Sequence, residues 1–275
     1  MYAKAKNYSM DKKPIISVVI PAFNAEKYIA EAIESVLGQS YENFELLVVN
    51  DCSTDCTSTV VESFAFHDKR VTLIDLPANK GGPAGPRNIG VLQARGRWIA
   101  FLDADDIWHP CKLQRQLDLL EKTGARFCST QMVDFVDANQ LSLSDASLDQ
   151  YEWVSFLSQL IKFRTPTSSV VVEKSLIERY PFNESMNYKA REDLDCWLHC
   201  HEEIGRSVKI TRPMMGYRII PGQISGQKWT MFKRHLHVLW RYRLMSGRAL
   251  HAGALLFTIS HFGLAIYYRL IKKGL

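Results

Sequence analysis

The sequence predicts an α/β fold with a mostly parallel sheet, and a basic helical extension at the C-terminal end. Two observations predict the sheet. Short β-branched runs alternate with amphipathic segments over the first 106 residues, and each run ends in polar or turn residues. A third observation predicts the extension, because residues 226–275 combine Lys and Arg with long apolar stretches. The composition, 47% hydrophobic and 23% charged, is typical of a soluble globular protein.

The first 106 residues follow the order of βαβ units. The expected strands cover residues 15–20, 44–49, 71–76 and 98–102, and the expected helices cover 26–37, 57–66 and 83–95. Parallel strands with right-handed crossovers bind ligands at their carboxyl ends. The predicted site therefore lies at residues 21–24, 50–55, 77–82 and 103–106.

The second half is more weakly patterned. We expect a helix after Pro110, strands at 127–135, 168–172 and 207–210, and helices at 153–161 and after Glu192. The resulting division is an N-terminal tail (1–13), a main α/β domain (14–225) and a helical extension (226–275). The main domain has two halves, residues 14–106 and residues 107–225.

An acidic tract, Leu102-Asp103-Ala104-Asp105-Asp106, ends the fourth predicted strand. Carboxylates at i and i+2 in a turn can approach one ligand, and a hard cation that bridges a diphosphate needs such oxygen ligands. Asp-x-Asp is common by itself, and a capped, solvated turn before the next helix is the alternative. The neighbouring strand ends decide between the two interpretations.

Those strand ends carry an ordered set of motifs that resembles family 2 glycosyltransferases, inverting enzymes of the GT-A fold, of the type found in bacterial surface-polysaccharide biosynthesis. The resemblance covers residues 14–228. Its motifs are Pro21-Ala22-Phe23-Asn24-Ala25-Glu26, Asn50-Asp51-Cys52-Ser53-Thr54-Asp55, Asn79-Lys80-Gly81-Gly82 through Arg87-Asn88, the acidic tract, Arg191-Glu192-Asp193 with Trp197, and Tyr217-Arg218 with Ser225.

The resemblance implies a role for each matching residue. The nucleotide-sugar site would comprise Pro21, Ala22, Phe23, Asn24, Glu26, Asp51, Asn79, Arg87, Asp103 and Ala104. A divalent cation, Mn2+ or Mg2+, would bind Asp105 directly and Asp103 in part, and Asp193 would be the general base. The acceptor or diphosphate side would comprise Glu192, Trp197, Arg218 and Ser225. Residues 14–225 would be the glycosyltransferase domain, with 14–106 as its nucleotide-binding half and 107–225 as its acceptor half.

Each assignment has a structural alternative. Asp51 could cap the following helix, the acids at 192 and 193 suit a helix N-terminus, and Arg87 could be a surface residue. The sequence also departs from the family pattern at two places. Cys52 stands at a turn position that commonly holds Gly, and Ile220 stands where many relatives place a metal- or diphosphate-binding His.

Other functions are disfavoured by motif order. A nucleotidyltransferase would carry its glycine-rich loop after the first strand, whereas Gly81-Gly82 follows the third. No G-x-G-x-x-G follows Ile20, which disfavours a dinucleotide oxidoreductase. A non-catalytic nucleotide-sugar binding module is disfavoured because Asp103, Asp105 and Asp193 are all present.

Charge is divided unevenly along the chain. From Ile204 to Leu275 there are 13 Lys or Arg and no Asp or Glu, so residues 1–203 carry 21 basic and 29 acidic residues, a formal charge of −8. Residues 229–244 predict a basic amphipathic helix, and residues 249–268 are mostly apolar. Three arrangements remain open for 249–268: docking on a membrane, packing on the enzyme or on a second subunit of a homodimer, and spanning a membrane.

The extension therefore suggests an acceptor in the membrane, a lipid-linked saccharide in the family that the chain resembles. No nucleic-acid-binding motif accompanies the basic charge, so we expect no nucleic acid partner. Residues 1–13 lack the apolar segment of a secretory signal, and the six cysteines form no compact disulfide framework. We expect a cytoplasmic enzyme, peripheral on the inner face of the cell membrane.

Overall fold

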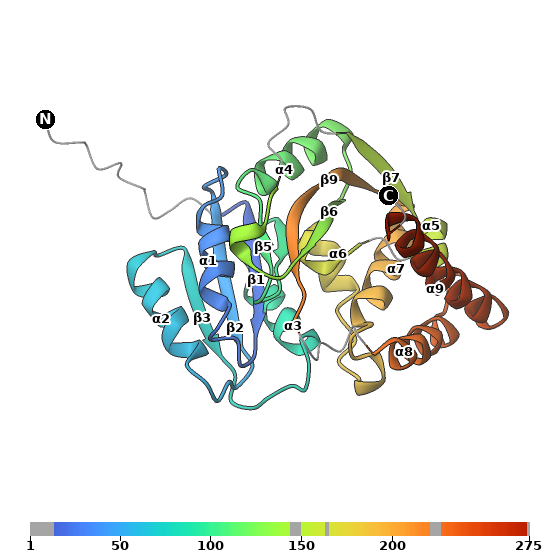
Figure 1. The fold of residues 1–275 in the computed structure, drawn as a ribbon, viewed down its shortest axis with the longest axis horizontal. Helices are drawn as coiled ribbons and strands as arrows, with labels where there is room; N and C mark the ends of the chain where they lie inside the picture. The colour runs from blue at the N-terminus through green and yellow to red at the C-terminus, as the bar shows by residue number, and fades with distance from the viewer. Residues whose placement is uncertain (1–13, 144–149, 163–164, 221–226, 274–275) are drawn as a thin grey trace, which may run out of the picture.

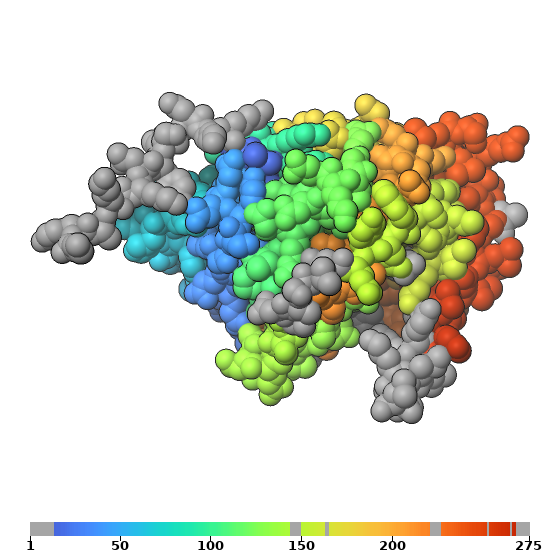
Figure 2. All heavy atoms as spheres, turned by 90° about the horizontal axis from the view of Figure 1, so that it is seen from above, coloured from blue at the N-terminus to red at the C-terminus, as the bar shows by residue number. Residues whose placement is uncertain are grey.

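In the computed structural model, the described residues are 14–143, 150–162, 165–220 and 227–273. Ser225 and residues 144–149 lie outside these ranges. The molecule is elongated, with the N-terminal half at one end and the C-terminal helices at the other (Figure 1, Figure 2).

The N-terminal half confirms the predicted βαβ order. The sheet order is β3-β2-β1-β4, and all three pairs are parallel. Its strands are β1 (Ile16–Ala22), β2 (Phe44–Asn50), β3 (Val71–Asp75) and β4 (Trp98–Phe101). Its helices are α1 (Ile29–Leu37), α2 (Thr57–His67) and α3 (Ala84–Gln93). Because Ala22 is level with Asn50, and Asn50 with Asp75, the strand-end loops emerge at one edge.

The second half has mixed strand directions. β8 lies antiparallel between β4 and β6, β9 is parallel to β6, and both β5 and β7 are antiparallel to β9. These strands are β5 (Ile107–Trp108), β6 (Phe127–Phe135), β7 (Tyr151–Ser155), β8 (Val171–Glu173) and β9 (Arg206–Arg218). The prediction of a mostly parallel sheet therefore holds for the nucleotide-binding half.

Two predicted elements in this half begin at different residues from those expected. The helix expected over 153–161 begins at Phe156, because Ser155 and Ser158 form a reciprocal capping box and the preceding residues pair with β9 as strand β7. The strand expected over 168–172 begins at Val171, because residues 167–169 form a 3-10 turn, η2 (Thr167–Ser169).

Helices cover both faces of the sheet and continue beyond it. The remaining helical segments are α4 (Lys112–Thr123), α5 (Phe156–Ile161), α6 (Lys174–Arg179), α7 (Glu192–Ile204), α8 (Lys228–Arg241), α9 (His251–Lys273), η1 (Ala138–Gln140) and η3 (Met186–Tyr188). No helix within the described residues is both long and apolar enough to cross a membrane.

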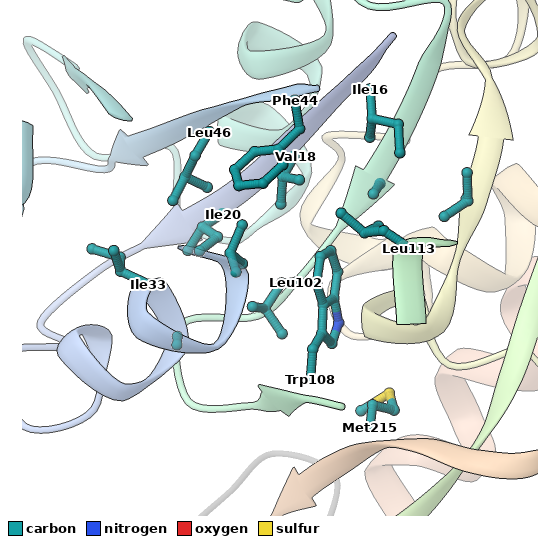
Figure 3. Close-up of a cluster of buried hydrophobic side chains, with 14 of the residues drawn as sticks. Ile16, Val18, Ile20, Ile33, Phe44, Leu46, Leu102, Trp108, Leu113 and Met215 are labelled. Atoms are coloured by element: carbon teal, nitrogen blue, oxygen red, sulfur yellow. The ribbon is translucent and has the colours of Figure 1, made fainter. Parts of the chain in front are cut away.

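Alternate residues of the central strands enter two different cores. Ile16, Val18 and Ile20 of β1 pack with α1, α2 and α4 on one face, together with Trp108 (Figure 3). Val19 lies on the opposite face, in a core with residues of α3, α6 and α7. The buried pattern of β1 and β2 on both faces explains why these strands have continuous β-branched sequences.

A third core joins the C-terminal helices to the rest of the protein. Its buried residues come from α5, α7, α8 and the start of α9. They are Leu160, Leu194, Leu198, Val238, Leu239, Tyr242 and Ala254. Of the arrangements expected for residues 249–268, the structure shows packing on the enzyme itself.

Candidate active site

The loops after β1 and β2 are joined by hydrogen bonds between their polar side chains and backbone. Asn24 Oδ1 accepts from Thr54 N at 2.8 Å, and the backbone N of Asn24 donates to Ser53 Oγ at 2.9 Å. Glu26 Oε2 accepts from Cys56 N at 2.9 Å. Asn24 lies in the left-handed region, with φ 48°, which Asn tolerates better than most residues. The two predicted nucleotide motifs therefore form one surface.

Residues of the first motif differ in what they can offer a ligand. Pro21 and Ala22 belong to β1 and are buried, so their side chains face the interior. Phe23 is 52% exposed at the tip of the strand. Among these three residues, only Phe23 presents its side chain to the solvent at the strand ends.

Asp51 links the second and third strand-end loops. Its backbone N donates to Ala22 O at 2.8 Å, and its Oδ1 accepts from Lys80 N at 2.8 Å. Asn79 Nδ2 donates to the backbone carbonyl of Asp51, also at 2.8 Å. Burial raises the pKa of the Asp51 carboxyl, and the Lys80 N–H opposes that shift. The Asp51 carboxylate therefore binds the loop after β3. It does not cap α2, which was the structural alternative.

Cys52 occupies the turn position at which the sequence departs from the family pattern, and its backbone is strained. Its φ is 59°, in the left-handed region that favours glycine. The family's usual Gly at this place is therefore explained by backbone conformation, and Cys52 adopts the same conformation at a cost of roughly 1–2 kcal/mol.

Arg87 bridges two carboxylates from distant parts of the chain. Its Nη2 lies 2.6 Å from Asp103 Oδ1 and its Nη1 lies 3.0 Å from Glu192 Oε1. Burial alone would lower the pKa of the Arg87 guanidinium, but the two carboxylates outweigh it and raise that pKa. Arg87 is only 3% exposed, so it is not a surface residue. The bridge joins the acidic turn after β4 to the N-terminus of α7.

The acidic turn is anchored through Asp106. This residue belongs to the acidic tract, but no role was predicted for it. Asp106 Oδ2 accepts from Ser168 Oγ at 2.6 Å, and Oδ1 accepts from Arg218 N at 3.0 Å. Ser168 Oγ also accepts from Asp103 N at 3.0 Å. Burial raises the pKa of Asp106 well above its usual range, and the charges of Asp105 and Asp103 add to the shift. No sequence signal pointed to Ser168.

This turn has the donor chemistry of a hard-cation site. Asp103 and Asp105 keep partly exposed carboxylates, and their repulsion of the Asp106 carboxylate is what a divalent cation would relieve. Within the described ranges no group of three or more His, Cys, Asp or Glu side chains forms a complete metal site. Mg2+ commonly takes one or two carboxylates and completes its shell with phosphates and water, so these residues fit such an ion.

Asp193 lies in the first turn of α7, next to the Arg87 bridge. Its Oδ1 accepts from Leu194 N at 2.8 Å, and its Oδ2 lies 3.4 Å from Thr167 Oγ1. Burial, followed by the charge of Glu192, raises the pKa of Asp193 to about 6, against the opposing charges of Arg191 and Arg87. A carboxylate of this pKa can accept a proton near neutral pH.

Of the three described residues expected on the acceptor or diphosphate side, Glu192 alone lies beside Asp193. Trp197 is fully buried among the rings of Phe101, Phe127 and Phe182, so its predicted place at the site is wrong. Its helical position turns it toward the sheet, where it fills the core. Ser225 lies outside the described residues.

Arg218 lies on the other side of the acidic turn. Its Nε donates to the Asp105 carbonyl at 2.8 Å, and its Nη2 pairs with Glu31 at 2.7 Å. Glu31 was not predicted as a partner from its sequence position. The guanidinium lies over the rings of Tyr28 and Phe135. A cavity of about 710 Å³ opens here, lined by Arg218 and by residues of α1, β5 and η1.

Known proteins resemble this chain over most of its length. An uncharacterized glycosyltransferase of Haemophilus influenzae is 33% identical and is matched over 80% of this chain and 89% of its own. The UDP-Glc:alpha-D-GlcNAc-diphosphoundecaprenol beta-1,3-glucosyltransferase WfgD of Escherichia coli is 30% identical, over 82% of this chain and 85% of its own.

Solved structures share the fold. The crystal structure of S. aureus TarS 1-349 in complex with UDP-GlcNAc has a TM-score of 0.69 and 22% identity, and the match covers 89% of this chain and 72% of that one. Residues 17–184 match the family described as Glycosyl transferase family 2. The ordered strand-end motifs, the GT-A architecture and this match agree, and the chain belongs to glycosyl transferase family 2.

Proposed function

We propose that this protein moves a hexose-type sugar from a UDP-sugar to a hydroxyl of a lipid-linked saccharide, in the assembly of a cell-envelope polysaccharide. The Arg87 bridge is the observation that carries the proposal, because it brings the acidic turn and the candidate base into one site. WfgD, whose name describes transfer to a diphosphoundecaprenol-linked sugar, supports the acceptor class.

In this reaction the strand-end loops hold the nucleotide. Asp51 and Asn79 lie beside its uracil ring, and Asp103 lies toward its ribose. Asp193 accepts the proton of the acceptor hydroxyl as its oxygen attacks the anomeric carbon. The diphosphate leaves from the opposite face, so one displacement inverts the anomeric centre. Arg87, fixed between Asp103 and Glu192, keeps the two halves of the site in register.

Mn2+ or Mg2+ would bind Asp105 and Asp103 and would offset the charge that develops on the leaving diphosphate. Calorimetry with UDP tests this part. We expect UDP affinity to fall at least tenfold in EDTA and to recover with Mn2+. Undiminished affinity in EDTA would contradict the metal assignment.

The reaction itself is tested by a hydrolysis screen over a panel of nucleotide sugars, because water can replace an unknown acceptor. We expect one UDP-sugar to be hydrolysed faster than its GDP and TDP counterparts. If no nucleotide sugar in the panel is hydrolysed, the proposed activity is wrong.

The C-terminal helices are proposed to place the enzyme on the inner face of the cell membrane. The outer side of α9 exposes apolar residues that recur at helical spacing, and α8 exposes two tryptophans. These residues are Leu255, Leu256, Ile259, Ile266 and Tyr267 on α9 and Trp229 and Trp240 on α8. Residues 204–275, which include both helices, contain 13 basic and no acidic residues. This charge favours an anionic lipid surface over a protein partner.

Sedimentation with phosphatidylglycerol vesicles tests the docking face. Leu256→Glu combined with Ile259→Glu should abolish co-sedimentation, since both side chains are more than half exposed and their loss leaves the third core intact. Leu92→Glu, which alters an exposed leucine of α3, is the matched control and should bind as the wild type does. Equal binding of the double variant would exclude this face.

A further inference from the structure

The C-terminal segment of the chain contacts α7 near both of its ends. Near its C-terminal end, Tyr242 OH donates to Glu202 Oε2 at 2.7 Å, and Met245 N donates to Glu202 Oε1 at 2.6 Å. Leu194, the residue that follows Asp193, is fully buried in the third core with residues of α8 and α9. The helix that carries Asp193 is therefore held along its length by residues 228–262.

Arg191 is the contact nearest to the base. Its guanidinium lies 5.9 Å from the ring centroid of Phe262 on α9, a cation–π distance. Its backbone N donates to Tyr188 O at 2.7 Å, and the Tyr188 ring in turn meets His237 of α8, edge to face, at 5.6 Å. The Arg191 side chain thus contacts α9 directly, and its backbone is linked to α8 through Tyr188.

The Arg191 guanidinium lies near three uncharged rings of the C-terminal helices, those of Phe262, His235 and His261. Its Nε is buried and has no hydrogen-bond partner in the structure. Two imidazoles from α8 and α9, those of His235 and His261, stack on each other at 4.5 Å beside Phe262. Burial, with the charges of neighbouring groups, lowers their pKa values to about 2 and about 3, so both are neutral at physiological pH.

The groups that act on Asp193 are few. Glu192 on the same helix raises its pKa, and Arg191 and Arg87 lower it. Arg87 is shared between Asp103 and Glu192, whereas Arg191 makes no such bridge and lies two residues from Asp193. Arg191 is therefore the cation best placed to keep the base ionised.

We propose that Arg191 is a positioning residue for the catalytic base, and that α8 and α9, through Phe262, hold it in place. The inference rests on the proposed role of Asp193. It makes the helices that carry the docking face part of the catalytic centre, since the inner side of α9 contacts Arg191 while the outer side is exposed.

Nucleotide-sugar hydrolysis as a function of pH provides the test on the full-length chain. Arg191→Gln should lower kcat about tenfold and move the acidic limb of kcat upward by about one pH unit, because an opposing charge is lost beside the carboxylate. Arg191→Lys, which retains the charge, should restore the limb. Phe262→Leu, which keeps apolar volume but removes the ring, should give an intermediate shift. UDP affinity, measured by calorimetry, should change less than twofold in all three variants.

Arg206→Gln is the matched control. Arg206, on β9, also lies over an aromatic ring, that of Trp153 on β7, at 3.9 Å. It should leave the pH profile unchanged. An unshifted limb in Arg191→Gln would overturn the inference even if kcat fell, and so would a limb that Arg191→Lys fails to restore. A wild-type enzyme without hydrolytic activity would instead refute the proposed function.

Discussion

The loops proposed to bind the nucleotide and the end of α7 that carries the proposed base are built in different ways. The loops follow four adjacent parallel strands, so the topology of the sheet alone aligns them at one edge. The end of α7 is held by contacts with distant segments: Arg87 of α3 pairs with Glu192, Thr167 of η2 lies near Asp193, and Phe262 of α9 lies against Arg191. The nucleotide side should therefore tolerate local changes, whereas the base side depends on long-range contacts.

The largest effect is expected at the base. Asp193→Asn keeps the shape of the side chain and removes its ability to accept a proton, so kcat for sugar transfer should fall about 10³-fold. UDP affinity should remain within twofold of the wild type, because the nucleotide loops are unaffected. Steady-state kinetics with calorimetry separate the two quantities. Transfer at the wild-type rate would refute the assignment of the base.

Breaking the bridge between the two regions comes next. Arg87→Met leaves Asp103 and Glu192 without their buried partner, and should lower the free energy of unfolding by about 3 kcal/mol, measured by denaturant titration. The control is Arg97→Met, because the Arg97 side chain is 70% exposed and lies 3.8 Å from Glu173. We expect that change to stay within about 0.5 kcal/mol. Equal losses would show that the bridge does not join the regions.

The pH dependence of kcat sharpens the comparison without a mutation. Asp193 must be ionised to accept a proton, and its pKa is raised to about 6, so kcat should fall about tenfold per pH unit below pH 6. UDP binding should change little between pH 7 and pH 6. A kcat that stays constant down to pH 4.5 would mean that the titrating base is another group.

The smallest effect is expected in the nucleotide loop. Cys52→Gly removes a side chain from a left-handed backbone conformation and should stabilise the protein by up to about 1 kcal/mol. Cys56→Gly is the control, because Cys56 has φ −79°, where glycine brings no relief. Thermal melting checks both. A destabilised Cys52→Gly would show that the loop relies on the Cys52 side chain.

The sequence alone was enough to predict the parallel sheet of the N-terminal half and the loops at its strand ends. Continuous β-branched runs with polar ends predict a buried parallel sheet, and in such a sheet the strand ends converge whatever the rest of the chain does. The motifs at 21–26, 50–55, 79–88 and 102–106 could be found for this reason. The basic amphipathic character of α8 and the apolar character of α9 were also evident in the sequence.

Only the tertiary structure decided which residues meet across the site. Ser168, Glu31 and Phe262 have no distinctive local pattern, and their contacts span more than 60 residues of chain. The prediction placed Trp197 at the site, whereas it lies in the core. Helical spacing does not show which face of α7 meets the sheet until the packing of the helix is known. A side chain acquires a partner through packing, and packing depends on the whole chain.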